Sequence, residues 1–480
     1  MTQTRKRLMI VGLDCLEPSL AFSRWADAMP FLSKLRAAGA FARMRSITPP
    51  ITVPAWQCLA TGCDPGVLGV YGFRNRQDYS YGGLKYADSR SVKEKRLWDY
   101  LSRVGKKNII LGVPLTHPAQ PLSGVLAAGF PLPGKDAEYT YPASLKQEIQ
   151  AICDYIPDVE EYRSDRKGEI LTELITMMER RFDVAERLLQ SRDWDLFMMV
   201  EMGTDRIMHL LLAAADASHL KHRPNDPLGP AVRNYYTLCD RLLQRLVEPY
   251  LNDPGVNLLV VSDHGAQPLD GGLRINEWLI DHGWLVLKSR PTEAKSLASW
   301  IDAEQVDWSK TRAWSDGGYY ARIMLNVAGR EPQGRIPAAD YETVRTRLAD
   351  DLQSIHGPAG EAWNNFVYRP QDVYREANGT PPDLLAMFND LRHRALGTIT
   401  PRADRANGAA AWYSDENDAG SDDANHSWEG CLVAAGEGVR SQGETPTVSL
   451  LDVAPTVLDY FGLPSPGKLH GRHLPLWDAA

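Results

Sequence analysis

The stretch RLMIVGLD, residues 7–14, is a short and almost continuous apolar run that ends in an aspartate. Such a run is typical of a strand that is buried on both faces, as in the parallel sheets of α/β proteins. Four further stretches repeat the design, with polar residues after each apolar run: KKNIILGVP (106–114), WDLFMMVEM (194–202), VNLLVVSDHG (256–265) and PPDLLAMFND (381–390). We therefore expect these runs to form strands of one mainly parallel sheet.

Helical patterns separate these runs, at MPFLSKLRAAGAF (29–41), LWDYLSRVGKK (97–107), ELITMMERRFDVAERLLQ (173–190) and VRNYYTLCDRLLQRLVEPYL (232–251). Strands that alternate with helices predict an α/β fold, with a doubly wound sheet flanked by helices. We expect a single catalytic domain over residues 1–480. Within it we expect a helical insertion at 130–190, an inserted cap or substrate-binding segment at 290–375, and a polar surface loop at 403–425.

The composition limits the partners of the chain. Its 480 residues are 44% hydrophobic, which is enough for a large core, and the net charge is −8. This charge argues against a nucleic-acid polymer as partner, because binding to a phosphate backbone needs a basic face. No run approaches the roughly 18 apolar residues of a membrane span, the N-terminus lacks the apolar core of a signal peptide, and the six cysteines form no CxxC pair. We expect a cytoplasmic protein with reduced thiols and no membrane partner.

Side chains of the kinds that bind metal ions occur in four short stretches. In TDRIMH (204–209) an aspartate and a histidine are four residues apart, so they would share one face of a helix. Others directly follow strand candidates, and ligands of doubly wound sheets bind beyond the carboxyl ends of the strands. We therefore expect them to meet at one edge, in a site that suits zinc, with manganese as the alternative. They are Asp14, Asp205, His209, Asp263, His264 and His426.

Thr52 is the candidate reacting group. It lies in ITPPITVPAW (47–56), in a proline-punctuated turn before a helical pattern that opens near Ala55. A hydroxyl at the N-terminus of a helix can contact a bound anion, and coordination to a metal ion would lower its pKa. The alternative is a threonine that only caps the helix.

Taken in order, the motifs GLD, PPITVPAW, TGCDP, DRIMH, SDHG, NHS, GEGV and LLDVAPTVLDYFGLPSPGKLHGRHL resemble the alkaline phosphatase superfamily over residues 8–475. The chain is most similar to the type I phosphodiesterase/nucleotide pyrophosphatase branch. The resemblance implies an alkaline-phosphatase-like fold and two divalent metal ions. One ion would be held by Asp205, His209 and His426, and the other by Asp14, Thr52, Asp263 and His264.

The resemblance also implies a mechanism in which Thr52 attacks phosphorus and forms a phospho-threonine intermediate. A pair of metal ions would clamp the attacking and leaving oxygens, and a covalent intermediate divides one hard step into two. The expected substrate is a small phosphate ester, with a phosphodiester or pyrophosphate bond in a nucleotide-like molecule.

The chain departs from the family pattern at two positions. Ala55 replaces the asparagine of TxPN, whose amide donates to a phosphoryl oxygen in the family, and Leu68 replaces the histidine of TGxxPxxHG. A phosphomonoesterase or a phosphonate hydrolase of the same superfamily is therefore an alternative, because a fold does not determine the substrate. A non-catalytic binding protein is a third reading, which the complete set of ligand-type residues disfavours.

Candidate substrate contacts are few. Arginines and a backbone N–H near the nucleophile could hold the phosphoryl oxygens, and aromatic rings could stack on a base or sugar. The candidates are Val53, Trp56, Arg74, Arg76, Arg206 and Tyr319. Cys15 and Cys58 lie near the site in sequence, where we expect them to be small buried fillers rather than ligands.

Overall fold

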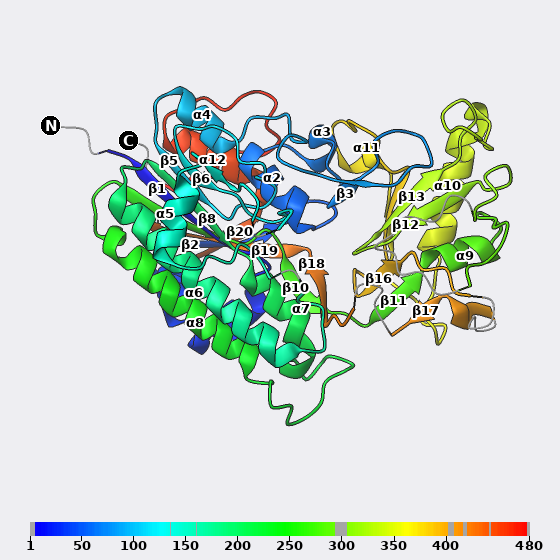
Figure 1. Cartoon of the computed structure of the whole chain (residues 1–480), viewed down its shortest axis with the longest axis horizontal. Coiled ribbons are helices and arrows are strands. Elements are labelled where there is room, and N and C mark those ends of the chain that lie inside the picture. Colours follow the sequence, from blue (N-terminus) through cyan, green and yellow to red (C-terminus); the bar gives the residue numbers. More distant parts are fainter. Residues whose placement is uncertain are drawn as a thin grey trace.

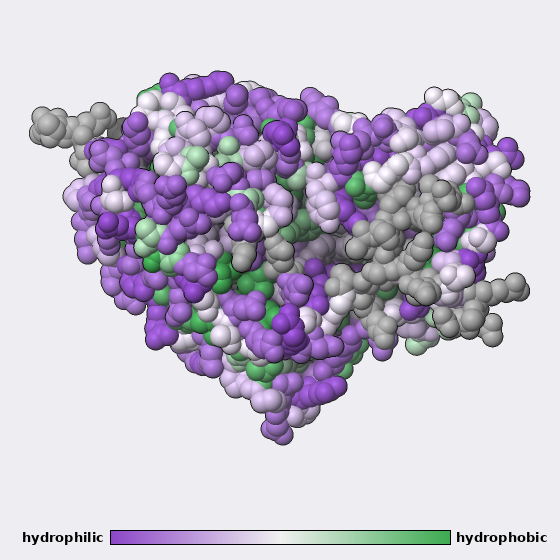
Figure 2. Space-filling model, viewed as in Figure 1, coloured by the Kyte–Doolittle hydropathy of each residue, from purple (hydrophilic) through white to green (hydrophobic). Residues whose placement is uncertain are grey.

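The computed structural model describes residues 5–134, 136–159, 161–292, 305–401, 408–415, 420–440 and 443–477. Figure 1 shows a large part, in which helices cover a central sheet, and a smaller part with its own short sheets and helices. None of the helices in the described ranges combines the length and the apolar character needed to cross a membrane. The face in Figure 2 is mainly hydrophilic, with hydrophobic residues singly or in small groups.

The central sheet has nine strands, most of them parallel. β1 pairs in parallel with β8 on one side and β9 on the other, with Leu8 opposite Leu196 and Asn257. Only β19 and β7 run against their neighbours. The order is β20 (Gly443–Ser449), β2 (Ala40–Arg45), β19 (Glu429–Gly436), β9 (Val256–Val261), β1 (Arg7–Leu13), β8 (Leu196–Glu201), β5 (Asn108–Leu111), β6 (Gly124–Ala127) and β7 (Thr140–Tyr141).

Four of the predicted strands are confirmed as β1, β5, β8 and β9, and nearly all of their residues are buried. The prediction for the run PPDLLAMFND is wrong in one respect. Its strand, β15 (Leu384–Met387), pairs antiparallel with β13 and β14 in a separate sheet of the smaller part. An apolar run indicates that a strand is buried, but a strand that is buried in any sheet has the same run. The run therefore does not show which sheet the strand joins.

Helices cover both faces of the central sheet, which confirms the predicted doubly wound architecture. In Figure 1, α6 and α8 lie on one side of the sheet, and α2, α4 and α12 lie on the other. The predicted helix at 29–41 ends at Ala38, and its last residues begin β2. The helices of the large part are α1 (Pro30–Ala38), α2 (Thr52–Thr61), α3 (Pro65–Leu68), α4 (Leu97–Arg103), α5 (Leu145–Ile152), α6 (Lys167–Ser191), α7 (Gly203–Ala215), α8 (Ala231–Leu251) and α12 (Val453–Tyr460).

The smaller part has a separate hydrophobic core, which includes the buried rings of Trp278, Trp284, Trp314 and Phe388. Its four-stranded antiparallel sheet has the order β12 (Ala313–Asp316), β13 (Ala321–Leu325), β15 and β14 (Phe366–Tyr368). A second sheet has the order β16 (His393–Leu396), β11 (Gly271–Arg274) and β17 (Tyr413–Ser414). The helices are α9 (Ile275–Asp281), α10 (Tyr341–Gln353) and α11 (Pro370–Val373).

The segment predicted as a cap, 290–375, contributes β12, β13, α10, β14 and α11 to this smaller part, while its residues 293–304 lie outside the described ranges. The segment predicted as a helical insertion, 130–190, contributes β7, α5 and most of α6. Short turns of 3₁₀ or π type complete the chain: η1 (Leu20–Arg24), η2 (Ala26–Ala28), η3 (Ala338–Asp340), η4 (Gly408–Ala411) and η5 (Leu450–Asp452).

Two short ladders lie outside these sheets. β3 (Arg74–Asn75) pairs with β4 (Lys85–Tyr86), and β10 (Gly265–Pro268) pairs with β18 (Ala424–Ser427). The second ladder matters here because one strand follows His264 and the other contains His426.

The prediction of a surface loop at 403–425 is wrong for its last residues. Asp422 and Asp423 are each only 4% exposed. They are buried because cationic and imidazole side chains from distant segments surround them, which composition does not reveal. Residues 403–407 and 416–419 of this stretch lie outside the described ranges.

Candidate metal centre and active site

The seven residues predicted to hold metal ions lie together at the carboxyl ends of the central strands. Asp14 follows β1, Asp263 and His264 follow β9, and α7, which begins just after β8, carries two more. Each of the seven is at most 2% exposed. Parallel strands deliver their following residues to a common edge, which explains how segments far apart in sequence meet here.

Asp205, His209 and His426 form what we call the three-residue group. The Oδ1 atom of Asp205 lies 3.3 Å from Nε2 of His209 and 3.5 Å from Nε2 of His426, and the two Nε2 atoms are 3.3 Å apart. The i, i+4 spacing on α7 brings the first two together, and β18 supplies the third. The three donor atoms thus lie close enough together for one cation to coordinate all of them.

Asp14, Thr52, Asp263 and His264 form what we call the Thr52 group. Nε2 of His264 lies 3.2 Å from Oδ2 of Asp263, 3.7 Å from Oδ1 of Asp14 and 3.1 Å from the hydroxyl of Thr52. Thr52 is the first residue of α2, so the helix begins there and not near Ala55 as predicted. The hydroxyl therefore lies at the positive end of the helix dipole, inside the group.

The buried carboxylate oxygens show that both groups fit cations. Asp14 Oδ1, Asp205 Oδ1 and Asp263 Oδ2 are buried, and no donor within the described residues forms a hydrogen bond with them. These are the oxygens that face the histidine Nε2 atoms. A buried acceptor without a partner is costly, and a divalent cation would satisfy it. Carboxylate and imidazole donors of this kind suit zinc and manganese.

The imidazole rings are held so that Nε2 points into the groups. Nδ1 of His426 lies 2.7 Å from the carbonyl oxygen of Pro50, and Nδ1 of His264 lies 3.2 Å from that of Gly265. A hydrogen bond from Nδ1 to a carbonyl leaves Nε2 as the free donor for a metal ion.

The charges in the Thr52 group are poorly balanced. Burial raises the pKa of the Asp14 carboxyl well above its usual range, and the neighbouring Asp263 and Asp205 raise it further. Burial likewise raises the pKa of Asp263, as does Asp205. Burial and the nearby His426 lower the pKa of His264. Without a cation, the surroundings therefore favour the protonated forms of Asp14 and Asp263. Metal binding requires their ionised carboxylates, and a bound cation would stabilise these.

The three-residue group behaves differently. Burial alone would raise the pKa of Asp205, but His209 and Arg206 outweigh it and hold this pKa well below its usual range. Burial alone would lower the pKa of His209, but Asp422 and Asp205 outweigh it and raise the pKa to about 10. Burial lowers the pKa of His426 to about 4.

Asp422 is a site residue that the sequence interpretation missed. Its Oδ1 lies 2.8 Å from Nδ1 of His209, and its Oδ2 lies 2.8 Å from Nη2 of Arg394. Arg163 also pairs with this carboxylate. A carboxylate behind a ligand histidine fixes the orientation of the ring and raises its basicity. The acidic run around it in sequence carries no signal that singles it out.

Trp56 and Arg206 contact two of the aspartates that are predicted to be metal ligands. The indole N–H of Trp56 donates to Oδ2 of Asp14 over 2.6 Å, and the ring is fully buried behind that carboxylate. Nη1 of Arg206 donates to Oδ2 of Asp205 over 2.8 Å, and Nη2 donates to Asp158 over 2.7 Å. The structure thus places both residues as hydrogen-bond partners of aspartates in the two groups.

Arg74 and Arg76 point toward the smaller part of the molecule. Arg74 lies 3.5 Å from Oδ1 of Asp316. Arg76 is buried, pairs with Glu331 over 3.1 Å, and packs over the ring of Trp314. Among the described residues, the Arg76 side chain donates to Glu331 and to the carbonyl of Ser80, and not to the two ligand groups.

Tyr319 and Val53 are the substrate candidates that the structure brings to the groups. The Tyr319 ring, in the turn between β12 and β13, lies 4.2 Å from the ring of His426, and its hydroxyl accepts from Arg163 over 2.7 Å. Val53 is the second residue of α2. Its N–H is among the first-turn donors that have no acceptor within a helix.

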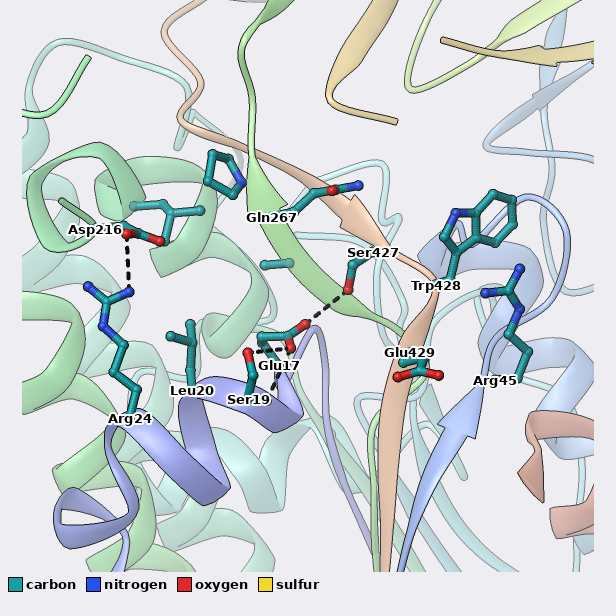
Figure 3. A pocket seen from close by; sticks show the side chains of 13 residues that line it. Glu17, Ser19, Leu20, Arg24, Arg45, Asp216, Gln267, Ser427, Trp428 and Glu429 are labelled. Atoms are coloured by element: carbon teal, nitrogen blue, oxygen red, sulfur yellow. Dashed lines mark hydrogen bonds and ion pairs between the residues drawn. The ribbon is translucent and has the colours of Figure 1, made fainter. Parts of the chain in front are cut away.

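A pocket of about 590 Å³ lies beside the β10–β18 ladder. Figure 3 shows that Ser427 points to Glu17 there, to which it donates over 3.0 Å, and that Trp428 lies near Arg45. None of the seven ligand residues lines this pocket within the described part of the chain. This pocket, which Glu17 lines, is therefore distinct from the two ligand groups.

Comparisons with known proteins identify the family and the fold of the chain. The family model described as type I phosphodiesterase / nucleotide pyrophosphatase matches residues 8–409. The human and murine structures of ectonucleotide pyrophosphatase / phosphodiesterase 5 share the fold, with TM-scores of 0.51 and 0.50. In each case the identity is 13%, over 96% of this chain and 96% of that chain. No curated protein sequence matches significantly. The chain belongs to the type I phosphodiesterase / nucleotide pyrophosphatase family of hydrolases.

Proposed function

We propose that this chain hydrolyses phosphodiester or pyrophosphate bonds of nucleotide-like substrates with the help of two metal ions, and that Thr52 is the nucleophile. The observation that carries the proposal is the position of the Thr52 hydroxyl. It lies at the start of α2, 3.1 Å from Nε2 of His264, within a group in which one buried oxygen of Asp14 and one of Asp263 have no hydrogen-bond donor among the described residues. The family match supports the hydrolase activity.

The two groups would hold one divalent ion each, with Asp205, His209 and His426 around the first and Asp14, Thr52, Asp263 and His264 around the second. When bound, the ions would neutralise phosphoryl oxygens and lower the pKa of the coordinated hydroxyl. We propose zinc, with manganese as the alternative, because imidazole and carboxylate donors accept both.

In the first step the Thr52 hydroxyl gives up its proton to water and its oxygen bonds to phosphorus, while the bond to the leaving oxygen breaks. The leaving group departs with the electron pair and takes up a proton from water. Water then attacks the phospho-threonine and restores the hydroxyl. The N–H of Val53, in the first turn of α2, would donate to a phosphoryl oxygen. Thr52 is only 2% exposed, so the surroundings exclude bulk water from the reacting hydroxyl.

Two residues indicate which substrates the site could accept. The Tyr319 ring, close to His426, offers a face on which a base or sugar can stack. Ala55 is fully buried and has no side-chain donor for a phosphoryl oxygen. This second observation makes a phosphomonoester or a phosphonate the second candidate substrate.

The proposal is tested with a p-nitrophenyl phosphate diester and the corresponding monoester, with Zn²⁺ or Mn²⁺ added. We expect the wild type to cleave the diester faster, and Thr52→Ala to lose at least about 10³-fold in kcat because the nucleophile is gone. Thr61→Ala is the matched control, because Thr61 is also buried on α2 but donates to the carbonyl of Gln57.

Faster cleavage of the monoester would favour the second candidate substrate. A Thr52→Ala variant that hydrolyses either ester at the wild-type rate would overturn the assignment of the nucleophile. A Thr61→Ala variant with the same loss as Thr52→Ala would show that damage to α2, and not loss of the nucleophile, causes the effect.

A further inference from the structure

Cys15 is fully buried directly after Asp14 and lies where the two ligand groups meet. Its Sγ, one carboxylate oxygen of Asp205 and one ring nitrogen of His264 all lie within 4.8 Å of one another. Asp205 belongs to the three-residue group, and His264 belongs to the Thr52 group. A sulfur atom therefore stands next to donors from both groups.

The backbone at Cys15 has an unusual conformation. Its φ is +62°, in the left-handed region that favours glycine over other residues. Three hydrogen bonds hold this turn: the Cys15 N–H donates to Oδ1 of Asp263 over 3.3 Å, and the Leu16 N–H donates to Oγ of Ser262 over 2.9 Å and to the carbonyl of Leu13 over 3.3 Å. The chain thus keeps a thiol side chain at a position where glycine would be unstrained. Strained residues of this kind cluster at functional sites.

A second observation points to a ligand at the Asp205 carboxylate, which is the member of this set that also belongs to the three-residue group. Oδ1 of Asp205 is buried and has no hydrogen-bond donor among the described residues. Cys15 Sγ, the Asp205 carboxylate and the His264 ring make up a group of one sulfur, one oxygen and one nitrogen donor. This donor set resembles those that hold zinc in proteins.

We propose that Cys15 is a sulfur ligand of the metal centre and directs it toward zinc rather than manganese. When an ion binds, the S–H bond is replaced by a metal–sulfur bond, and the proton passes to solvent. Thiolates favour zinc, whereas manganese prefers carboxylate and water ligands. This inference rests on the proposed two-metal function and replaces the interpretation of Cys15 as a small buried filler.

The test measures metal binding directly. Wild type loaded with Co²⁺ should show a sulfur-to-cobalt charge-transfer band in the near ultraviolet, and Cys15→Ser should lack it. Competition with a chelator should show that Cys15→Ser weakens Zn²⁺ binding roughly tenfold or more. The same variant should change Mn²⁺ binding by less than about threefold, since manganese gains little from sulfur.

Two further variants control the experiment. Cys58→Ser removes an equally buried thiol on α2 that belongs to none of the three ligand sets, so the cobalt band and the Zn²⁺/Mn²⁺ preference should stay unchanged. Cys15→Gly suits the backbone at φ +62°, so it should fold and unfold on heating like the wild type, yet lack the band.

A wild-type cobalt protein without the band, or a Cys15→Gly protein with the wild-type band and metal preference, would overturn the inference. Because binding needs no substrate, this result is separate from the hydrolysis assay. If Thr52→Ala hydrolyses normally while the band still depends on Cys15, the nucleophile assignment fails and the sulfur ligand stands. If hydrolysis depends on Thr52 but the band does not depend on Cys15, the reverse holds.

Discussion

The two ligand groups lie next to each other but differ in how their charges are balanced. In the three-residue group, Asp205 pairs with Arg206, and the pKa of this carboxyl is low while that of His209 is high. In the Thr52 group, Asp14 and Asp263 oppose each other in a buried site, and the pKa of each is raised. The protein supplies the countercharge for the three-residue group, whereas a bound cation would supply it for the Thr52 group.

This difference shows two ways to build a metal site. Around the three-residue group the charged partners Arg206 and Asp422 hold the ligands in place before an ion arrives. The Thr52 group brings like charges together at an electrostatic cost that a cation would remove. Loss of metal should therefore destabilise the Thr52 group more.

The largest expected effect is on catalysis through the Thr52 group. Asp263→Asn removes one of the carboxylate charges there, and we expect kcat/KM to fall by about 10³-fold or more, since metal ions supply several kcal/mol of stabilisation. Elemental analysis should show that about one ion per chain is lost. Unchanged metal content together with unchanged activity would contradict the ligand role of Asp263.

The next effect concerns the stability of the metal-free protein. Asp205→Asn removes one buried carboxylate partner from Arg206 and from His209, which keep Asp158 and Asp422, so the free energy of unfolding should fall by about 2 kcal/mol. Asp14→Asn relieves like-charge repulsion, so it should leave this free energy unchanged or raise it by about 1 kcal/mol. Urea unfolding in chelator measures both, and equal losses in the two variants would refute the contrast.

A smaller effect should follow from the support behind His209. Asp422→Asn weakens the hold on the imidazole, so we expect metal affinity of the three-residue group to fall by about 10- to 100-fold. The neighbouring Asp423→Asn is the control, because Asp423 is also buried but pairs with Lys167. Chelator competition should separate the two variants; similar losses in both would mean that Asp422 acts only through local packing.

The smallest expected effect comes from the support behind Asp14. Trp56→Phe deletes the indole N–H that donates to this carboxylate, whereas Trp314→Phe deletes a buried indole N–H that has no hydrogen-bond partner among the described residues. The first variant should therefore lose about 1.5 kcal/mol more in the free energy of unfolding than the second. Chemical denaturation of the metal-loaded proteins provides the measurement, and equal losses would show that the hydrogen bond to Asp14 adds nothing.

Local patterns predicted much of the fold, and they identified the seven residues that the structure brings together at the candidate site. Strands β1, β8 and β9 are visible as apolar runs because they are buried on both faces, and the polar residue after each run marks the edge of the sheet. Asp205 and His209 are visible as a pair because helical spacing is a local property. The same reasoning misplaced β15, since a buried run does not say which sheet it joins.

Such patterns could not predict which side chains form hydrogen bonds with the candidate metal ligands. Asp422 meets His209 across 213 positions of the chain, and Trp56 meets Asp14 across 42. Neither residue stands out in its own segment, because a hydrogen bond between distant segments imposes no periodic pattern on the sequence of either segment. The acidic run around Asp422 resembles a solvated loop, yet cationic side chains bury that carboxylate.

The sequence by itself determined which residues can form strands, which of them end at a common edge, and which side chains can bind a metal ion, because these depend on neighbours within a few positions. Only the tertiary structure decided which aspartates have cationic partners, that Trp56 and Arg206 stand behind ligands, and that Cys15 reaches both groups. These depend on how distant segments pack, and burial then sets the charge state of each group through the loss of water.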